Sequence, residues 1–118
     1  DHLVITQEVD EALLLRQVPA LLLQPILENS IKHGYSYNNT DLEVHITIFS
    51  EGKHLVIKVE NNGALLRVSH AVLLKKGMGL ANINDRLSNL YGKDYFFEIS
   101  NNPDGTGVQT LIKIPDNI

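Results

Sequence analysis

Cysteine is absent from this sequence. Disulfide bonds, thiolate chemistry and zinc sites built on cysteine are therefore excluded, and the absence is compatible with a cytosolic location. Long apolar runs are absent as well. A membrane-spanning helix needs roughly 20 apolar residues, whereas the longest run here, residues 20–23, is followed by Gln24 and Pro25.

Basic residues are few and scattered. The chain has 10 Lys and Arg against 14 Asp and Glu, a formal net charge of -4. Lys75 and Lys76 are the only adjacent basic pair. A nucleic-acid surface would be basic, so the charge argues against one. An initiator methionine and a signal peptide are also missing, because the chain opens with Asp1 and His2; we therefore expect it to be part of a longer protein.

What is present suits one globular domain over residues 1–118. The apolar fraction is 43% over 118 residues, and a chain of this length buries roughly two-thirds of its unfolded surface in a single core.

The first half of the chain reads as a strand, a helix and a hairpin. Residues 2–9 alternate weakly and predict a short peripheral strand. Pro19 favours a helix start, Gly34 favours its end, and Pro25 inside predicts a kink or a restart. Residues 42–49 and 55–59 are β-branched and alternating, with a turn at Glu51 and Gly52, which predicts an antiparallel hairpin.

The second half reads as a loop, a helix and a second hairpin. Residues 64–76 lack a helix start and predict a mobile loop. A helix is indicated by the spacing of four apolar residues up to the stop at Gly92, namely Leu80, Ile83, Leu87 and Leu90. Residues 95–100 and 108–114 predict another hairpin. The fold class expected is an α/β (α+β) two-layer sandwich, with a mixed, mostly antiparallel sheet packed on helices.

The first helix carries polar residues on both flanks of its apolar face. Asn29 and His33 lie four apart on one flank, and Glu28 and Lys32 lie four apart on the other. A surface ion pair worth about 0.3–0.5 kcal/mol would explain the second pair. His33 would be explained by its position at the helix C-terminus, where a positively charged side chain is favourable. These residues alone leave a purely structural role open.

Two further segments carry polar or glycine residues where ligands bind. Leu55, Ile57 and Val59 share one strand face, and Asn61 continues it towards the interior, where a polar side chain needs a partner in the turn or in a ligand. Gly63 would let a ligand approach the backbone closely.

Gly77 and Gly79 precede the second helix, whose first N–H groups are a natural seat for phosphate oxygens, with Lys75 and Lys76 nearby. A glycine pair of this kind is weak evidence alone and also suits a plain loop-to-helix junction.

Four ordered motifs together resemble a known family. The stretches "LLLQPILENSIKHG", "VIKVENNG", "GMGLANINDRLSNLYG" and "GTGVQTLIKIP" are similar to the ATP-binding catalytic domain of sensor histidine kinases, above all the LytS-like ones, whose N box reads close to LQPLVENAIKHG. The similarity covers essentially the whole chain. It implies the Bergerat (GHKL, HATPase) fold.

The resemblance implies roles for the polar residues. Asn29 would coordinate Mg²⁺ that bridges the ATP phosphates, Glu28 would be the general base or polarise the attacking group, and Lys32 and His33 would approach the phosphates. Residues 64–76 would form the lid. The nucleotide-binding positions implied are Asn29, Asn61, Gly63, Gly77, Gly79, Leu80, Thr106 and Val108. The reaction is γ-phosphoryl transfer to a histidine by positioning and charge neutralisation.

Two positions depart from the family. Asn61 stands where an Asp usually accepts a bond from the adenine amino group, which would weaken binding by roughly 1 kcal/mol. Val108 stands where a Thr often lines the base pocket, with Thr106 and Thr110 offset. One hypothesis is a working kinase domain with relaxed base selectivity, since an amide could also donate to guanine. The other is a docking or scaffolding domain that has lost nucleotide affinity.

The phosphoacceptor is expected outside this chain. None of the five histidines, His2, His33, His45, His54 and His70, falls on a long helix of the kind that presents the acceptor in this family. The resemblance implies upstream dimerisation helices with the acceptor, a homodimer, a response regulator as partner, and a cytoplasmic domain of a membrane-bound bacterial sensor. The isolated chain would bind nucleotide without phosphorylating itself. An anti-sigma Ser/Thr kinase is the alternative of another class.

Overall fold

The computed structural model describes residues 2–9, 18–34, 41–63, 65–66 and 80–115. A five-stranded sheet forms its base, with the strand order β1-β2-β3-β5-β4. β1 pairs in parallel with β2, and the other three pairings are antiparallel. The prediction of a mixed, mostly antiparallel sheet is therefore confirmed. The strands are β1 (His2–Val9), β2 (Asp41–Glu51), β3 (His54–Asn62), β4 (Phe96–Asn101) and β5 (Gly107–Pro115).

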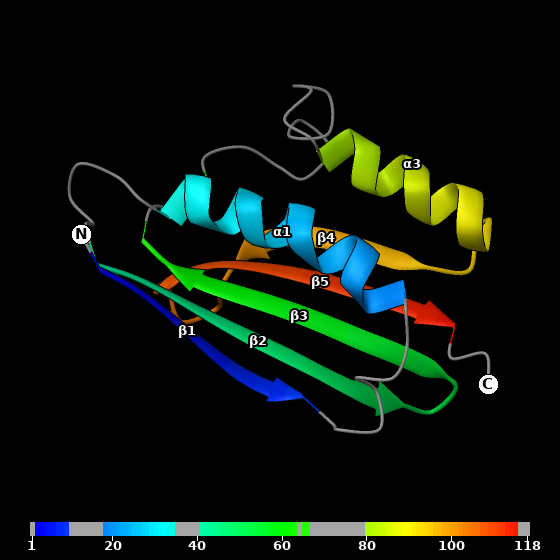
Figure 1. The fold of residues 1–118 in the computed structure, drawn as a ribbon, viewed down its shortest axis with the longest axis horizontal. Helices are drawn as coiled ribbons and strands as arrows, with labels where there is room; N and C mark the ends of the chain where they lie inside the picture. Colours follow the sequence, from blue (N-terminus) through cyan, green and yellow to red (C-terminus); the bar gives the residue numbers. More distant parts are fainter. Residues whose placement is uncertain (1, 10–17, 35–40, 64, 67–79, 116–118) are drawn as a thin grey trace.

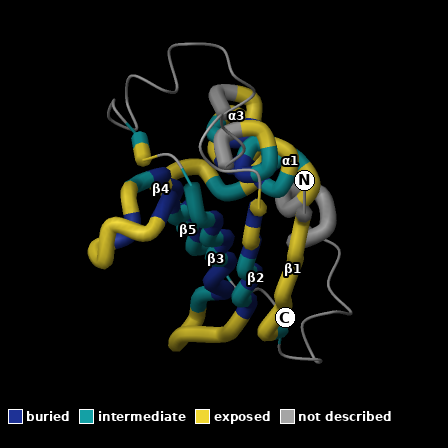
Figure 2. Tube along the Cα trace, turned by 90° about the vertical axis from the view of Figure 1, so that its left-hand side faces the viewer, coloured by how far each residue is buried: buried dark blue, intermediate teal, exposed yellow. Residues whose placement is uncertain are grey.

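Two described helices, α1 (Val18–Gly34) and α3 (Leu80–Tyr91), cover one face of this sheet (Figure 1). β2 shows why: its residues alternate between buried and more exposed, as a strand covered on one face must. The buried residues Leu42, Val44, Ile46 and Ile48 share the core with Ile26 of α1 and with Ile83 and Leu87 of α3. Figure 2 shows the same distribution, with buried positions between the sheet and the helices. The predicted two-layer sandwich is confirmed.

The helix α1 runs through Pro25 without a break. Of the two expected outcomes the restart is therefore wrong, and the kink stays a prediction. Ile26 and Ser30 are each 1% exposed, and they are four residues apart, so they lie on the same side of the helix. The packing of this buried side against β3 and β2 stabilises the helix despite the lost backbone hydrogen bond.

The helix α3 ends where the sequence predicts. Gly92 has a positive φ of 65°, and its N–H donates to the carbonyl of Ser88 at 2.8 Å. A left-handed glycine is the usual residue just beyond a helix end. The hydroxyl of Tyr95 donates to the side chain of Asn84 at 2.9 Å, which ties α3 to the chain that enters β4.

The two central strands are longer than predicted. The turn between them is at Gly52 and Lys53, one residue later than expected, and Gly52 has φ of 62°. β3 also continues through Asn61 and Asn62, which pair with Val108 and Gly107 of β5. The predicted end of this strand at residue 59 is therefore wrong.

The loop predicted at residues 64–76 lies outside the described residues except for residues 65–66. Here the side chain of Asn101 accepts from the N–H of Leu66 at 2.7 Å and donates to its carbonyl at 3.2 Å. Neither helix in the described part of the chain is long and apolar enough to cross a bilayer.

Candidate functional site

Two of the predicted motifs lie at one end of the sandwich. At this end β3 and α1 finish and β5 begins (Figure 1). The helix α1 contacts β3, β5 and α3. The sequence places Glu28 to His33 in the second half of α1 and Asn61 at the end of β3, so the fold brings the first two predicted motifs to the same end.

Asn61 faces the helices, as predicted. It is 3% exposed, and its neighbours on the adjoining strands are Val44 and Val108, which are both buried. The side-chain nitrogen of Asn61 donates to the carbonyl of Asn62 at 2.9 Å. The turn therefore satisfies one of the two N–H donors of this amide, and its oxygen has no hydrogen bond from the described residues.

The backbone around Asn61 is held closely from both sides. The Asn62 side chain accepts from the N–H of Glu43 at 2.9 Å and donates to the carbonyl of Asp41 at 3.2 Å, so it joins the end of β3 to the start of β2. A Cβ at Gly107 would lie 1.9 Å from the backbone oxygen of Asn61. Gly63, just beyond the strand, has φ of 108°, which only glycine adopts readily.

The polar residues of α1 are accessible. Glu28 and Lys32 are exposed and Asn29 is half-buried. The Glu28 carboxylate accepts from the side chain of Gln24 at 3.3 Å, and within the described residues no ion pair joins it to Lys32. The surface ion pair considered as an explanation for these two residues therefore does not form. The side chain of His33 lies outside the described residues.

The glycine motif of the third segment falls outside the described residues. Gly77 and Gly79 are not described, and Leu80 is described only as the first residue of α3. Their prediction as nucleotide-binding positions stays a prediction.

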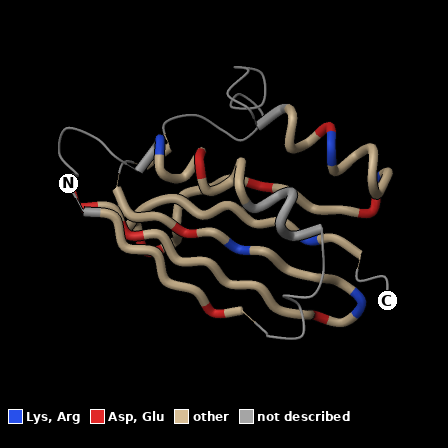
Figure 3. Tube along the Cα trace, in the orientation of Figure 1, with Lys and Arg blue, Asp and Glu red and all other residues tan. Residues whose placement is uncertain are grey.

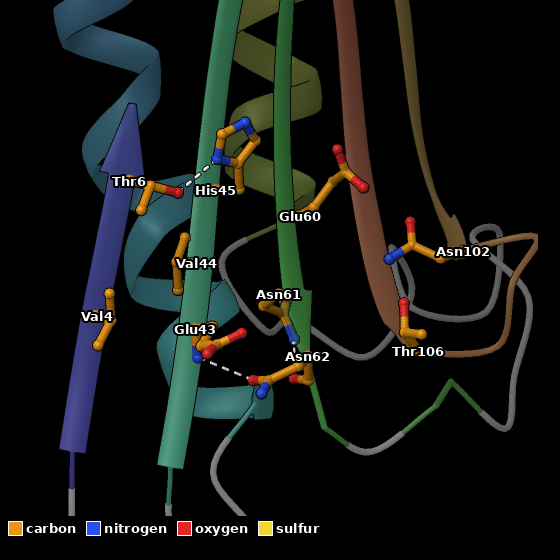
Figure 4. Close-up of a pocket in the computed structure, with 10 residues that line it drawn as sticks. All are labelled: Val4, Thr6, Glu43, Val44, His45, Glu60, Asn61, Asn62, Asn102 and Thr106. Atoms are coloured by element: carbon orange, nitrogen blue, oxygen red, sulfur yellow. Dashed lines mark hydrogen bonds between the residues drawn. The ribbon is translucent and has the colours of Figure 1, made fainter. Parts of the chain in front are cut away.

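The two remaining predicted positions have different surroundings. Val108 is 3% exposed and lies beside Asn61. Thr106 is exposed and its hydroxyl donates to the carboxylate of Asp104 at 2.6 Å. Hydrogen bonds from the Thr106 side chain and N–H lower the pKa of Asp104 below its ordinary value of 3.8. Thr106 also lines a hollow of about 420 Å³ (Figure 4).

Sequence reasoning missed two residues that shape this end of the molecule. Asn62 was quoted within a motif without a role, yet its amide joins two strands. Gly107 was quoted within a motif without a role, yet it admits the backbone of Asn61. A glycine inside an otherwise alternating strand is a recognised sign of such a close approach.

Comparison with known proteins gives a consistent picture. No protein-family model matches the chain. Over 103 residues, 87% of the chain, it is 35% identical to the sensor histidine kinase BtsS of Escherichia coli strain K12, and the match spans 17% of that protein. It is 29% identical over 120 residues to the sensor protein LytS of Enterococcus faecalis, covering 94% of the chain and 20% of LytS. The chain thus spans about a fifth of the length of these curated relatives.

Solved structures show the same fold. The catalytic domain of histidine kinase ThkA superposes with a TM-score of 0.73 at 16% identity, covering 97% of this chain and 79% of that one. The histidine kinase domain of the blue-light activated kinase EL346 from Erythrobacter litoralis gives a TM-score of 0.72 at 19% identity, covering 96% of this chain and 51% of that one.

Proposed function

Because the chain is homologous to part of the sensor histidine kinases and has the fold of their catalytic domains, we propose that it binds ATP and transfers the γ-phosphoryl group to a histidine upstream of these residues. The observation that carries the proposal is the placement of Asn61. It is buried on the helix-covered face, at the end of the sandwich where α1 brings Glu28 and Asn29.

Asn61 would read the base through its side-chain oxygen. One of its two amide N–H groups is already bonded to the carbonyl of Asn62, and its oxygen has no partner among the described residues, so the oxygen is the acceptor offered to a ligand. Rotating the Asn61 amide by a half-turn would place its side-chain oxygen against the carbonyl oxygen of Asn62, and two acceptors repel each other. An acceptor here suits the amino group of adenine and opposes the O6 of guanine. We therefore propose that the free acceptor oxygen gives ATP the preference over GTP, in place of the relaxed selectivity that the sequence suggested.

Val108 would close the base pocket beside Asn61 by shape alone. It has no hydroxyl to hold a water, and it shares the row of Asn61 on the neighbouring strand. The base would then depend on one polar contact instead of two. We infer a weaker affinity than that of a domain with Asp and Thr at these positions, by roughly 1 kcal/mol for each lost hydrogen bond.

The residues of α1 fit a magnesium nucleotide. Asn29 is half-buried, and its amide oxygen is the kind of ligand that a hard cation takes. The described residues contain no group of three or more metal-ligating side chains, so this cation would take its other ligands from phosphates and water. Bound there, it would neutralise phosphate charge.

Glu28, Lys32 and His33 lie within four residues of Asn29, and we propose that side chains from both flanks of the helix reach the same phosphates. In this proposal Lys32 and His33 orient the phosphates, and Glu28 polarises the attacking group. Gly63, Gly77, Gly79, Leu80 and Thr106 complete the proposed nucleotide-binding set.

The acceptor histidine would come from elsewhere in a longer protein. His45 and His54 lie in the sheet and are paired with Glu8 and Asp94 at 3.4 Å each. Neither is presented on a helix. We propose that upstream dimerisation helices supply the acceptor in a homodimeric, membrane-bound sensor with this domain in the cytoplasm. A response regulator would then take up the phosphoryl group, and the isolated chain would not phosphorylate itself.

A thermal-shift titration of the chain with Mg²⁺ and a non-hydrolysable ATP analogue tests the proposal. A ligand at 100 times its Kd stabilises the folded state by about 2.7 kcal/mol. Asn61→Ala and Asn29→Ala should remove the shift, Asn61→Asp should enlarge it, and the GTP analogue should give less. Asn89→Ala, at an exposed position of α3, is the matched control. No shift with the wild type, or an equal shift in Asn61→Ala, would end the proposal.

A further inference from the structure

β1 forms one edge of the sheet and has a strand neighbour on one side only. Among the described strands it pairs with β2 alone, so the N–H and C=O groups along its outer edge have no strand partner. The pairing with β2 is continuous from His2 to Val9, without the bulge that would twist an edge away from neighbours. Because β2 lies between β1 and β3, this free edge faces away from Asn61.

Three consecutive apolar residues of β1 are exposed: Leu3 by 43%, Val4 by 50% and Ile5 by 42%. Leu3 lies beside Leu42 of β2, which is 0% exposed. Ile5 lies beside Val44, which is 1% exposed. The helices therefore cover this row of side chains at β2 and leave it open at β1, which Figure 2 shows as exposed along most of its length. Val4 points to the other face, so β1 presents apolar side chains on both sides of its unpaired edge.

The edge of β1 lacks the usual protection against pairing. Natural edge strands are commonly shielded by charged side chains or by proline. β1 contains no Lys, Arg or Pro, and Figure 3 shows its one acidic position near the end of the strand. This residue, Glu8, is already paired with His45 at 3.4 Å. The opposite edge strand differs, because β4 alternates between exposed and more buried residues and carries the exposed Glu98 near its middle.

A second copy of the chain matches this edge. Closed pairs of identical chains are related by a twofold axis, and an axis perpendicular to the sheet sets the two edge strands antiparallel, with the helices of both copies on the same side. When the pairing is centred on Val4, this residue lies opposite its own equivalent. Leu3 then lies opposite Ile5 of the second copy, so all three apolar residues meet apolar partners. Residues 2–6, which would pair, contain no Asp, Glu, Lys or Arg, so no like charges face each other.

We propose that β1 pairs with β1 of a second copy in an antiparallel register centred on Val4, which joins two five-stranded sheets into one continuous sheet. Main-chain hydrogen bonds would supply the affinity, and the apolar pairs would fix the register. About five residues a side are far fewer than the 20–30 of a stable interface, so isolated chains should associate weakly. The pairing requires no nucleotide and is independent of the kinase proposal.

Weak pairing would matter most where two copies are already held together. Tethering converts the second contact into an intramolecular one, with an effective concentration of about 1 mM for a short flexible linker. In the homodimeric sensor proposed above, the upstream helices would provide this tether. Only this step rests on the proposed function, because association of the isolated chain does not depend on it.

Sedimentation equilibrium of the 118-residue chain from about 10 µM to about 1 mM tests the pairing. We expect the average mass to rise from that of a monomer towards that of a dimer, with a Kd of about 0.1–1 mM. Val4→Lys would place two ammonium groups opposite each other and should raise the Kd about tenfold or more. Phe96→Lys is the matched control, because Phe96 is 43% exposed on the other edge strand, and it should leave the Kd unchanged. A wild-type chain that stays monomeric at about 1 mM, or equal weakening by the two variants, would overturn the proposal.

Cross-linking tests the register without introducing a charge. The chain has no cysteine, so a disulfide in a single-cysteine variant must join two copies. Val4→Cys should give covalent dimers under mild oxidation, because position 4 lies opposite itself. Gln7→Cys, on the same exposed strand, should not, since the two residues 7 would be about 20 Å apart, too far for a disulfide. No dimer from Val4→Cys, or as much dimer from Gln7→Cys, would refute the pairing.

Discussion

Ser30 is a buried hydroxyl whose removal should stabilise the protein. It lies on the side of α1 that packs on the sheet, is 1% exposed, and its oxygen has no hydrogen-bond partner. The similar N box of LytS-like kinases has Ala at this position. The perturbation is therefore Ser30→Ala, which deletes one oxygen atom and leaves the rest of the helix unchanged.

The expected gain comes from two terms and is reduced by a third. An unpartnered buried hydroxyl costs about 1–3 kcal/mol relative to its hydrated state. Alanine adds up to about 0.5 kcal/mol through its higher helix propensity. The small void left by the oxygen opposes both terms. The net expectation is a free energy of unfolding higher by about 1 kcal/mol, which for a domain of this size raises the melting temperature by about 4 °C.

Urea unfolding followed by circular dichroism measures this difference directly, with an unchanged m-value as the sign that only stability has changed. Ser88→Ala is the matched control: Ser88 is exposed on α3, so this variant gains only helix propensity. If Ser30→Ala were less stable than the wild type, or gained no more than Ser88→Ala, the hydroxyl would have to be satisfied and the reasoning would be refuted.

Three further predictions concern the strand ends. Gly107→Ala should lower the free energy of unfolding by about 3 kcal/mol, since its Cβ would lie 1.9 Å from the backbone oxygen of Asn61; urea unfolding measures this, and a loss below 1 kcal/mol would contradict it. Tyr95→Phe loses the 2.9 Å bond to α3 and should cost about 1 kcal/mol, seen as a lower urea midpoint; an unchanged midpoint would show that the bond contributes nothing. The pKa of Asp104 is lowered by Thr106, so its stabilising effect is complete above pH 3.8 and is lost as the pH falls through the folded-state pKa. Thr106→Val should move this pKa back up in an NMR titration, and an unmoved pKa would exclude the hydroxyl as its main cause.

Much of the fold could be predicted because its signals are local. The alternation of β2 and β3, the four-residue spacing of Ile83 and Leu87, and the stop at Gly92 each depend on neighbouring residues only. The inward direction of Asn61 followed from the same period of two.

The errors arose where tertiary contacts override local preference. Asparagine favours turns, yet Asn61 and Asn62 stay in β3 because β5 pairs with them. Pro25 disfavours a helix interior, yet α1 continues because its apolar face is buried. The orientation of the Asn61 amide could not be predicted from the sequence either, because it depends on a hydrogen bond to the carbonyl of Asn62. For the candidate site, the sequence predicted the burial of Asn61 but not which atom of its amide is bonded to the turn.

The contact between position 107 and the oxygen of residue 61 joins main chain to main chain. No side chain sets its spacing, so a change among the apolar side chains of the interior acts on it less directly than a substitution at position 107 does. Any variant of this domain, natural or selected, therefore has to keep the single hydrogen-sized substituent at position 107.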